Sequence, residues 1–139
     1  MIELLASAFV FTADQFSKRI ILRNFSEQSC LSLGPRLKLR RVTHGKPSFK
    51  RTVNRVGMVA LWACSVAGLA GTIRWGHLFQ SQPARISIGM AIGGATSNLF
   101  DCLRSQRVVD FIDLGFWRVF NLADLAIVVG IGLALVFLY

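Results

Sequence analysis

The sequence predicts an all-α membrane protein with four transmembrane helices and a small β-rich surface loop region between helices one and two. The first observation is the composition, because 53% of the 139 residues are hydrophobic and only 17% are charged. The second is that the apolar residues gather in four stretches almost free of charge, at 2–13, 56–73, 86–100 and 125–139. The third is a basic segment, 24–54, that separates the first two stretches.

Each helix is predicted from one apolar stretch and its flanking residues. Eighteen helical residues rise about 27 Å and fifteen about 22 Å, against a hydrocarbon core of roughly 30 Å, so only the second stretch spans by itself. The other three need polar residues inside their ends. We expect one integral membrane domain over 1–139, with helices at about 2–23, 55–74, 84–103 and 121–139. A soluble helical bundle is the alternative, but four such runs leave too little polar surface to cover them.

The extramembrane loop, at about 24–54, is predicted to be irregular with one short strand. Four residues there interrupt any helix: Gly34, Pro35, Gly45 and Pro47. Between them, "RLKLRRV" at 36–42 alternates apolar and basic residues, which is typical of a surface strand with one solvent-exposed face. We therefore expect a small strand layer on the membrane surface.

The net charge of +9 is unevenly distributed. Eleven of the sixteen Lys and Arg lie between Lys18 and Arg55, and residues 28–100 contain no acid. Because this basic region lies between two membrane segments, we expect it to contact anionic headgroups or an acidic partner rather than nucleic acid. Three cysteines without paired spacing, far from both histidines, argue against a zinc site or disulfide framework. No metal or cofactor is expected.

The order of the four helices gathers polar residues on one side of the bilayer. If every helix crosses, that side receives Asp14, Gln15, Lys18, Asn98, Asp101, Asp110, Asp113, Asn121 and Asp124. Asp14 and Lys18 stand four residues apart, and Asn98 and Asp101 stand three apart, so each pair shares a helix face. Ionisable groups near hydrocarbon persist mainly in bundle interiors, where they pair or function. The sequence thus predicts a polar pocket built from three helix ends.

Two carboxylates in this pocket suggest a type of chemistry. Asp110 and Asp124 stand at the two ends of the apolar and aromatic segment "VVDFIDLGFWRVFNLAD" at 108–124. Two carboxyl groups in close proximity share one proton near neutral pH. Such a pair can activate water for attack on an amide and protonate the leaving amine. No Ser/His/Asp set offers a competing nucleophile.

Four motifs, in order and context, resemble those of signal peptidase II, the lipoprotein signal peptidase family. They are "DQFSK" at 14–18, "GGATSNLFD" at 93–101, "VVDF" at 108–111 and "FNLAD" at 120–124. The resemblance covers nearly the whole chain. It implies a four-helix aspartic endopeptidase of the bacterial inner membrane with its active site near the periplasmic face. The implied partner is a prolipoprotein, cut just before its diacylglyceryl-modified cysteine.

The resemblance also implies roles for individual residues. Asp110 and Asp124 match the catalytic dyad, and Asn121 matches an asparagine that holds the second aspartate or the substrate. The supporting positions are Asn98 and Asp101 on helix three and Asp14 with Lys18 on helix one. Several positions depart from the family pattern: Ser97 replaces a glycine, Cys102 an arginine, Gln106 a glycine and Thr43 an asparagine of the substrate-contacting loop.

Charge and resemblance disagree about orientation. The side with the aspartates carries fourteen of the sixteen basic residues, and the positive-inside rule assigns such a face to the cytoplasm. The family resemblance assigns it to the periplasm, which is the orientation we expect. The basic loop would then bind anionic headgroups or an acidic partner outside the membrane.

Other interpretations remain for the same residues. Singly, Asp110 could be a helix cap, Asp124 an acid favoured by a helix dipole, and the asparagines interhelical hydrogen-bonding groups. A catalytically idle relative that binds a lipidated or transmembrane partner, as a subunit of a larger membrane complex, is the main alternative function, and a small ion transporter is a weaker one. Asp113 is expected to be exposed and incidental. An interfacial aromatic patch is expected from Phe116, Trp117 and Phe120.

Overall fold

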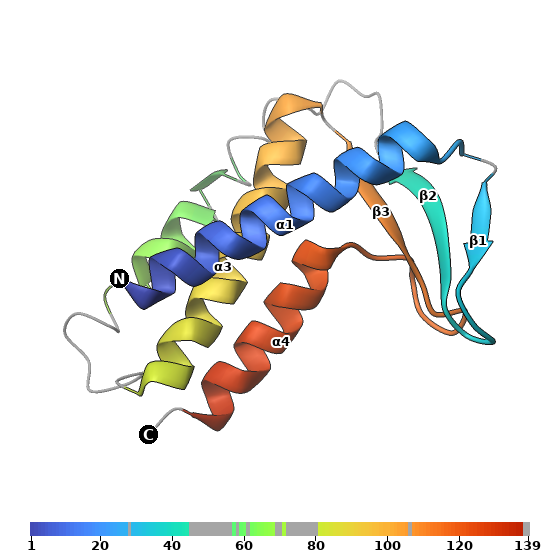
Figure 1. The fold of residues 1–139 in the computed structure, drawn as a ribbon. Coiled ribbons are helices and arrows are strands. Elements are labelled where there is room, and N and C mark those ends of the chain that lie inside the picture. The colour runs from blue at the N-terminus through green and yellow to red at the C-terminus, as the bar shows by residue number, and fades with distance from the viewer. Residues whose placement is uncertain are drawn as a thin grey trace.

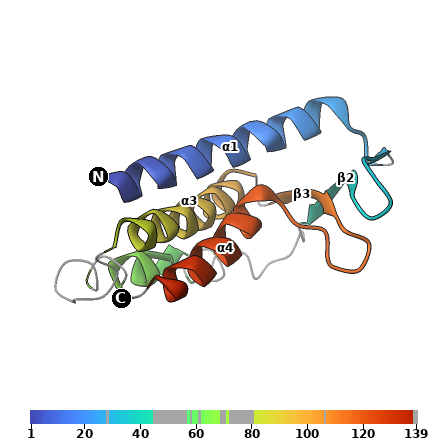
Figure 2. The same cartoon turned by 60° about the horizontal axis from the view of Figure 1, so that its bottom comes forward.

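Three long helices pack side by side, and a small antiparallel sheet extends from one end of them (Figure 1). The computed structural model of the chain describes residues 1–27, 29–44, 57, 59–60, 62–68, 71, 81–105 and 107–137. The helices are α1 (Ile2–Asn24), α3 (Gln82–Arg104) and α4 (Leu122–Val136). The start of α1 and the end of α4 lie at the end of the bundle opposite the sheet (Figures 1 and 2).

Helix α3 lies between α1 and α4 and packs against both. Its glycines allow the close approach. A Cβ on Gly93 would collide with the backbone oxygen of Ser7 in α1, and one on Gly94 would collide with that of Ala123 in α4. These small residues bring the three helices close together and explain how polar groups from all three can meet.

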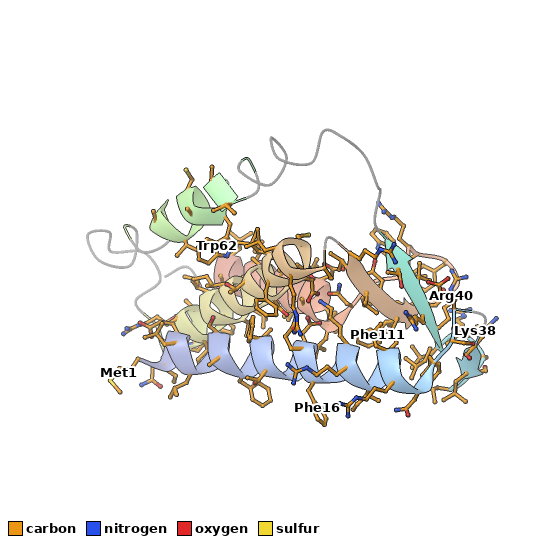
Figure 3. The ribbon with its side chains drawn as sticks, turned by 90° about the horizontal axis from the view of Figure 1, so that it is seen from above. Met1, Phe16, Lys38, Arg40, Trp62 and Phe111 are labelled. Atoms are coloured by element: carbon orange, nitrogen blue, oxygen red, sulfur yellow. The ribbon has the colours of Figure 1, made fainter. Side chains whose placement is uncertain are left out.

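The sheet contains β1 (Cys30–Ser32), β2 (Lys38–His44) and β3 (Val108–Asp113), paired antiparallel in that order. Strand β2 agrees with the strand predicted in the loop, whereas β3 was not predicted. Alternate residues of β3 are buried. Val109 and Phe111 pack with Ile21 of α1, and Figure 3 shows Phe111 between the sheet and that helix. The sheet is therefore fixed to α1 by a small hydrophobic core.

Asp113 is buried, so the prediction that it is exposed was wrong. Only 8% of the residue is exposed, and its carboxylate pairs with Arg40 Nε at 2.8 Å. The physical reason is the alternation of a strand, which places Asp113 on the same side of β3 as Val109 and Phe111. Its charge is compensated across the sheet.

The described helices lie close to the predicted ranges. Helix α1 begins and ends within one residue of 2–23, and α3 within two of 84–103, while α4 is described up to Val136. The predicted helix at 55–74 lies partly outside the described residues, of which 62–68 are helical, and loop residues 45–54 lie wholly outside them. Within the part of the chain that the structure describes, no helix has both the length and the apolar character needed to span a membrane.

Candidate active site

The site is built around a buried ion cluster between α1 and α3. Lys18 Nζ lies 2.5 Å from Asp14 Oδ2, one helical turn away, and 2.6 Å from Asp101 Oδ2 on α3. Asp14 is fully buried and Lys18 is 3% exposed. Removing charges from water is costly unless they pair and form further hydrogen bonds. We call Asp14, Lys18 and Asp101 the inner cluster.

Asp14 also binds the first turn of α4. Its Oδ1 accepts a hydrogen bond from the backbone N–H of Ala123 at 2.9 Å. The first N–H groups of a helix have no partner within the helix, and the helix dipole favours an anion there. A carboxylate from α1 thus satisfies the beginning of α4 and fixes the position of that turn.

Gln15 and Ser97 form hydrogen bonds with the inner cluster; Gln15 was predicted on the polar side of the bundle but without a role, and Ser97 was not predicted as a site residue. Gln15 Nε2 donates to Asp101 Oδ1 at 2.7 Å and to Ser97 Oγ at 2.9 Å. The Ser97 hydroxyl donates to Asp14 Oδ2 at 2.7 Å and is fully buried. The available signal was their position, because each directly adjoins a predicted site residue, Asp14 or Asn98.

Asp124 is held at the start of α4 by a capping box. The Asn121 side chain accepts from the backbone N–H of Asp124 at 2.9 Å, and the Asp124 carboxylate accepts from the backbone N–H of Asn121 at 3.4 Å. Asn121 is fully buried, and Asp124 is partly buried. The sequence "NLAD" therefore sets the local geometry of this carboxylate through ordinary helix-capping physics.

Asn98 connects Asp124 to the inner cluster. Its Nδ2 donates to Asp124 Oδ1 at 2.7 Å. Its Oδ1 accepts from Lys18 Nζ at 3.1 Å and from Asn121 Nδ2 at 3.2 Å. Lys18 and Asp124 are thus bound to the same amide, that of Asn98, which fixes their relative positions.

Asp110 reaches the same asparagine from the sheet. It lies on β3, opposite Val42, and its Oδ1 accepts from Asn121 Nδ2 at 2.8 Å. The chain returns from β3 to α4 through an isolated bridge between Ile112 and Phe120, which brings the strand next to the start of the helix. Asp110 and Asp124 are therefore both bound to Asn121.

All seven predicted site residues belong to one continuous polar network, made of Asp14, Lys18, Asn98, Asp101, Asp110, Asn121 and Asp124. Within this network Asn121 is bound to both Asp110 and Asp124. Among the residues that the structure describes, no group of three or more His, Cys, Asp or Glu side chains could hold a metal ion.

An apolar cleft of about 360 Å³ adjoins this network. It lies between α3, α4 and helical residues 62–68, and Asn98 is in its lining with Trp62, Leu99 and Ile127. Trp62 points toward α3 (Figure 3) and donates from Nε1 to Thr96 Oγ1 at 3.2 Å. The cleft can accept an apolar segment beside a polar centre.

Solved structures with the same fold define a class. The chain superposes on a structure described as a bacterial membrane enzyme, solved by the in meso method at 1.9 Å resolution, with a TM-score of 0.79. The match covers 96% of this chain and 90% of the other at 23% identity. A second such structure, at 2.3 Å resolution, gives a TM-score of 0.77, 24% identity and 96% and 85% coverage. The likeness shows that the fold is that of known bacterial membrane enzymes.

Sequence comparison identifies the family within that class. The profile of signal peptidase (SPase) II matches residues 6–139, so the chain belongs to the signal peptidase II family and is a peptidase by family. It is 37% identical to a lipoprotein signal peptidase of Moorella thermoacetica, covering 92% of this chain and 86% of the relative. It is 32% identical to that of Shewanella loihica, with 89% and 78% coverage. The resemblance seen in the motifs is confirmed.

Proposed function

We propose that this protein is a membrane aspartic endopeptidase that removes the signal peptide of a prolipoprotein at its lipid-modified cysteine. The observation that carries the proposal is the placement of Asp110 and Asp124 on a single buried asparagine, Asn121. The names of the relatives, lipoprotein signal peptidases, supply the substrate class. In this proposal Asp110 and Asp124 are the catalytic residues.

The proposed reaction uses one protonated and one ionised carboxyl group. The ionised carboxylate takes a proton from a water molecule, whose oxygen attacks the carbonyl carbon of the peptide bond before the cysteine. The protonated carboxyl donates its proton to the carbonyl oxygen. The carboxyl group that took the water proton then donates it to the leaving amine as the C–N bond breaks. The other carboxylate takes back the hydroxyl proton of the intermediate as the carbonyl re-forms, so both carboxyl groups return to their starting state. The products are a signal peptide ending in a carboxylate and a lipoprotein with a free amino terminus.

The remaining polar residues position this pair. Asn98 Nδ2 donates to Asp124 Oδ1, and Asn121 Nδ2 donates to Asp110 Oδ1, so each acid is oriented by an amide. Lys18 is held between Asp14 and Asp101. The inner cluster is therefore a brace for α4 and for Asn98 rather than a participant in proton transfer.

The apolar cleft beside the pair suits a substrate. Because it adjoins Asn98 and is lined mainly by apolar side chains, it would receive the hydrophobic part of the signal peptide.

The proposed location is the bacterial inner membrane, with one domain of four transmembrane helices and the active site near the periplasmic face. Large apolar side chains cover the outside of the bundle, among them Leu4, Leu5, Phe9, Phe16, Val128, Ile131 and Leu135. Phe16 projects from α1 away from the other elements (Figure 3). The charges of the inner cluster point inward, so they do not oppose insertion in the way that lipid-facing charges would.

A cleavage assay tests this function. Purified protein in detergent is expected to cut a diacylglyceryl-modified prolipoprotein, and Asp110→Asn and Asp124→Asn should each lower the rate at least about 100-fold because each removes one proton-transferring group. Asp113→Asn is the matched control on the same strand and should retain most of the activity. Equal cleavage by all three variants would refute the dyad. Stable binding of a prolipoprotein without cleavage by the unaltered protein would favour an idle relative.

A further inference from the structure

Two loops at the far end of the sheet enclose a second cleft, remote from the carboxylate pair. One loop joins β1 to β2 and the other follows β3, and they lie next to each other in both ribbon views (Figures 1 and 2). The cleft has a volume of about 470 Å³ and is lined by Pro35, Arg36, Lys38, Leu114, Gly115 and Phe116. We call it the hairpin cleft.

The walls of the hairpin cleft are held in place by the sheet. Lys38 stands opposite Asp113 in the register of β2 and β3. Asp113 Oδ1 accepts from the backbone N–H of Gly115 at 2.8 Å, and Gly115 has a φ of 77°, a conformation that favours glycine. One buried carboxylate thus fixes the turn that forms one wall.

The charge of the hairpin cleft is positive. Arg36 and Lys38 are both exposed and both line it. The neighbouring acid, Asp113, is already paired with Arg40. An arginine fork and a lysine ammonium together suit the oxygens of a phosphate group.

The rim of the hairpin cleft is apolar. Phe116 is 74% exposed and Trp117 is 69% exposed on one loop, and Leu33 is 56% exposed on the other. Aromatic side chains favour the boundary between lipid and water, and basic residues there attract anionic lipid. A soluble anion could be bound by Arg36 and Lys38 and would gain nothing from the apolar rim.

We infer that the hairpin cleft binds the phosphate headgroup of an anionic phospholipid, with Arg36 and Lys38 on the phosphate and Phe116 and Trp117 in the interface. The inference rests on the membrane location proposed above. Its consequence is that the sheet, which carries Asp110, is held at the membrane surface.

Thermal unfolding in neutral detergent tests the inference. Phosphatidylglycerol should raise the Tm of the unaltered protein more than phosphatidylcholine does, by about 3 °C or more at saturation, because a ligand of the folded state stabilises it. Arg36→Gln with Lys38→Gln should abolish this difference. Arg19→Gln with Arg23→Gln removes the same charge from exposed positions on α1 and should preserve it.

Two outcomes would overturn the inference. An undiminished phosphatidylglycerol effect in the Arg36 and Lys38 double variant would exclude the hairpin cleft as its location. An equal rise in Tm with inorganic phosphate or glycerol phosphate would assign the site to a soluble anion. Prolipoprotein cleavage by the same double variant in neutral lipid should stay within about twofold of normal, since a remote site does not touch the reacting groups. Failure of cleavage therefore bears on the proposed function, and failure of the Tm difference on the cleft.

Discussion

The bundle has an ionic link between α1 and α3 at each of its two ends, and the two links differ in burial. Near the sheet, Lys18 pairs with Asp14 and Asp101 in the inner cluster. At the opposite end, Arg85 Nη2 lies 2.8 Å from Glu3 Oε1, and Glu3 also pairs with the amino terminus. The Lys18 side chain is 4% exposed and that of Arg85 is 37% exposed. We call Glu3 and Arg85 the outer pair.

Ion pairs of similar composition can therefore have different roles in the same bundle. A surface pair contributes little, because water and salt screen it. A buried cluster is costly to form, and loss of one member leaves the others uncompensated. Only the inner cluster continues, through Asn98, to a carboxylate of the candidate dyad. We infer that its value lies in geometry rather than in net stability.

Lys18→Met should have the largest effect on the free energy of unfolding. It leaves Asp14 and Asp101 buried without their cation, and we expect a loss of about 3–5 kcal/mol in the free energy of unfolding. Thermal unfolding in detergent measures the effect. Arg19→Met, at the exposed neighbouring position, is the matched control and should change stability by less than about 0.5 kcal/mol. Equal stability of the two variants would contradict the account of the inner cluster.

Gly94→Ala should have the next largest effect, because it alters packing at the start of α4. The added Cβ would collide with the backbone oxygen of Ala123 and lie 3.0 Å from Ile127 Cγ1. We expect a loss of about 1–3 kcal/mol, with reduced cleavage because Asp124 moves with that turn. Gly132→Ala, where a Cβ meets nothing within 4 Å, should be neutral or stabilising by up to about 1 kcal/mol. The free energy of unfolding and the cleavage rate of both variants test this prediction.

Ser97→Ala tests a single hydrogen bond to the inner cluster. The change removes the hydroxyl that donates to Asp14 and accepts from Gln15. We expect a loss of about 1 kcal/mol, since one internal hydrogen bond is lost and the Asp14 carboxylate keeps its contacts with Lys18 and Ala123. Ser97→Thr keeps a hydroxyl and serves as the comparison in the same unfolding measurement. An unchanged free energy of unfolding in Ser97→Ala would show that the Ser97 hydroxyl does not contribute to stability.

Glu3→Gln should have the smallest effect. The outer pair is partly exposed, and we expect its loss to lower the free energy of unfolding by less than about 1 kcal/mol, and by less still at high salt. Cleavage should be unchanged, because the pair lies at the end of the bundle away from the network. A loss as large as that of Lys18→Met would remove the distinction between the two ends.

Much of the helical architecture was predictable because it depends on local sequence. The apolar stretches predicted α1 and α3 to within two residues, and the spacing of Asp14 and Lys18 predicted that they share a helix face, where they form an ion pair. Asn98 and Asp101 were predicted to share a face, and both contact Lys18. Helical periodicity is enough for such pairs, since neighbours at three and four residues are fixed by the helix itself.

The sheet was less predictable because its pairs join distant parts of the chain. Strand β3 reads as a mixed polar and apolar segment, and only its pairing with β2 shows which residues face inward. The error over Asp113 has this origin. Ser97 was missed for a related reason, since its hydrogen bonds join α3 to Asp14 and Gln15 of α1.

Local sequence accounts for α1, α3 and α4, for the capping of α4 by "NLAD" and for the family motifs to which the acids belong. Only the tertiary structure decided that Asp110 of a strand and Asp124 of a helix bind the same asparagine. The physical reason is that spacing along a helix fixes neighbours over a few residues. The meeting of a strand with a helix end depends instead on packing between segments far apart in the chain.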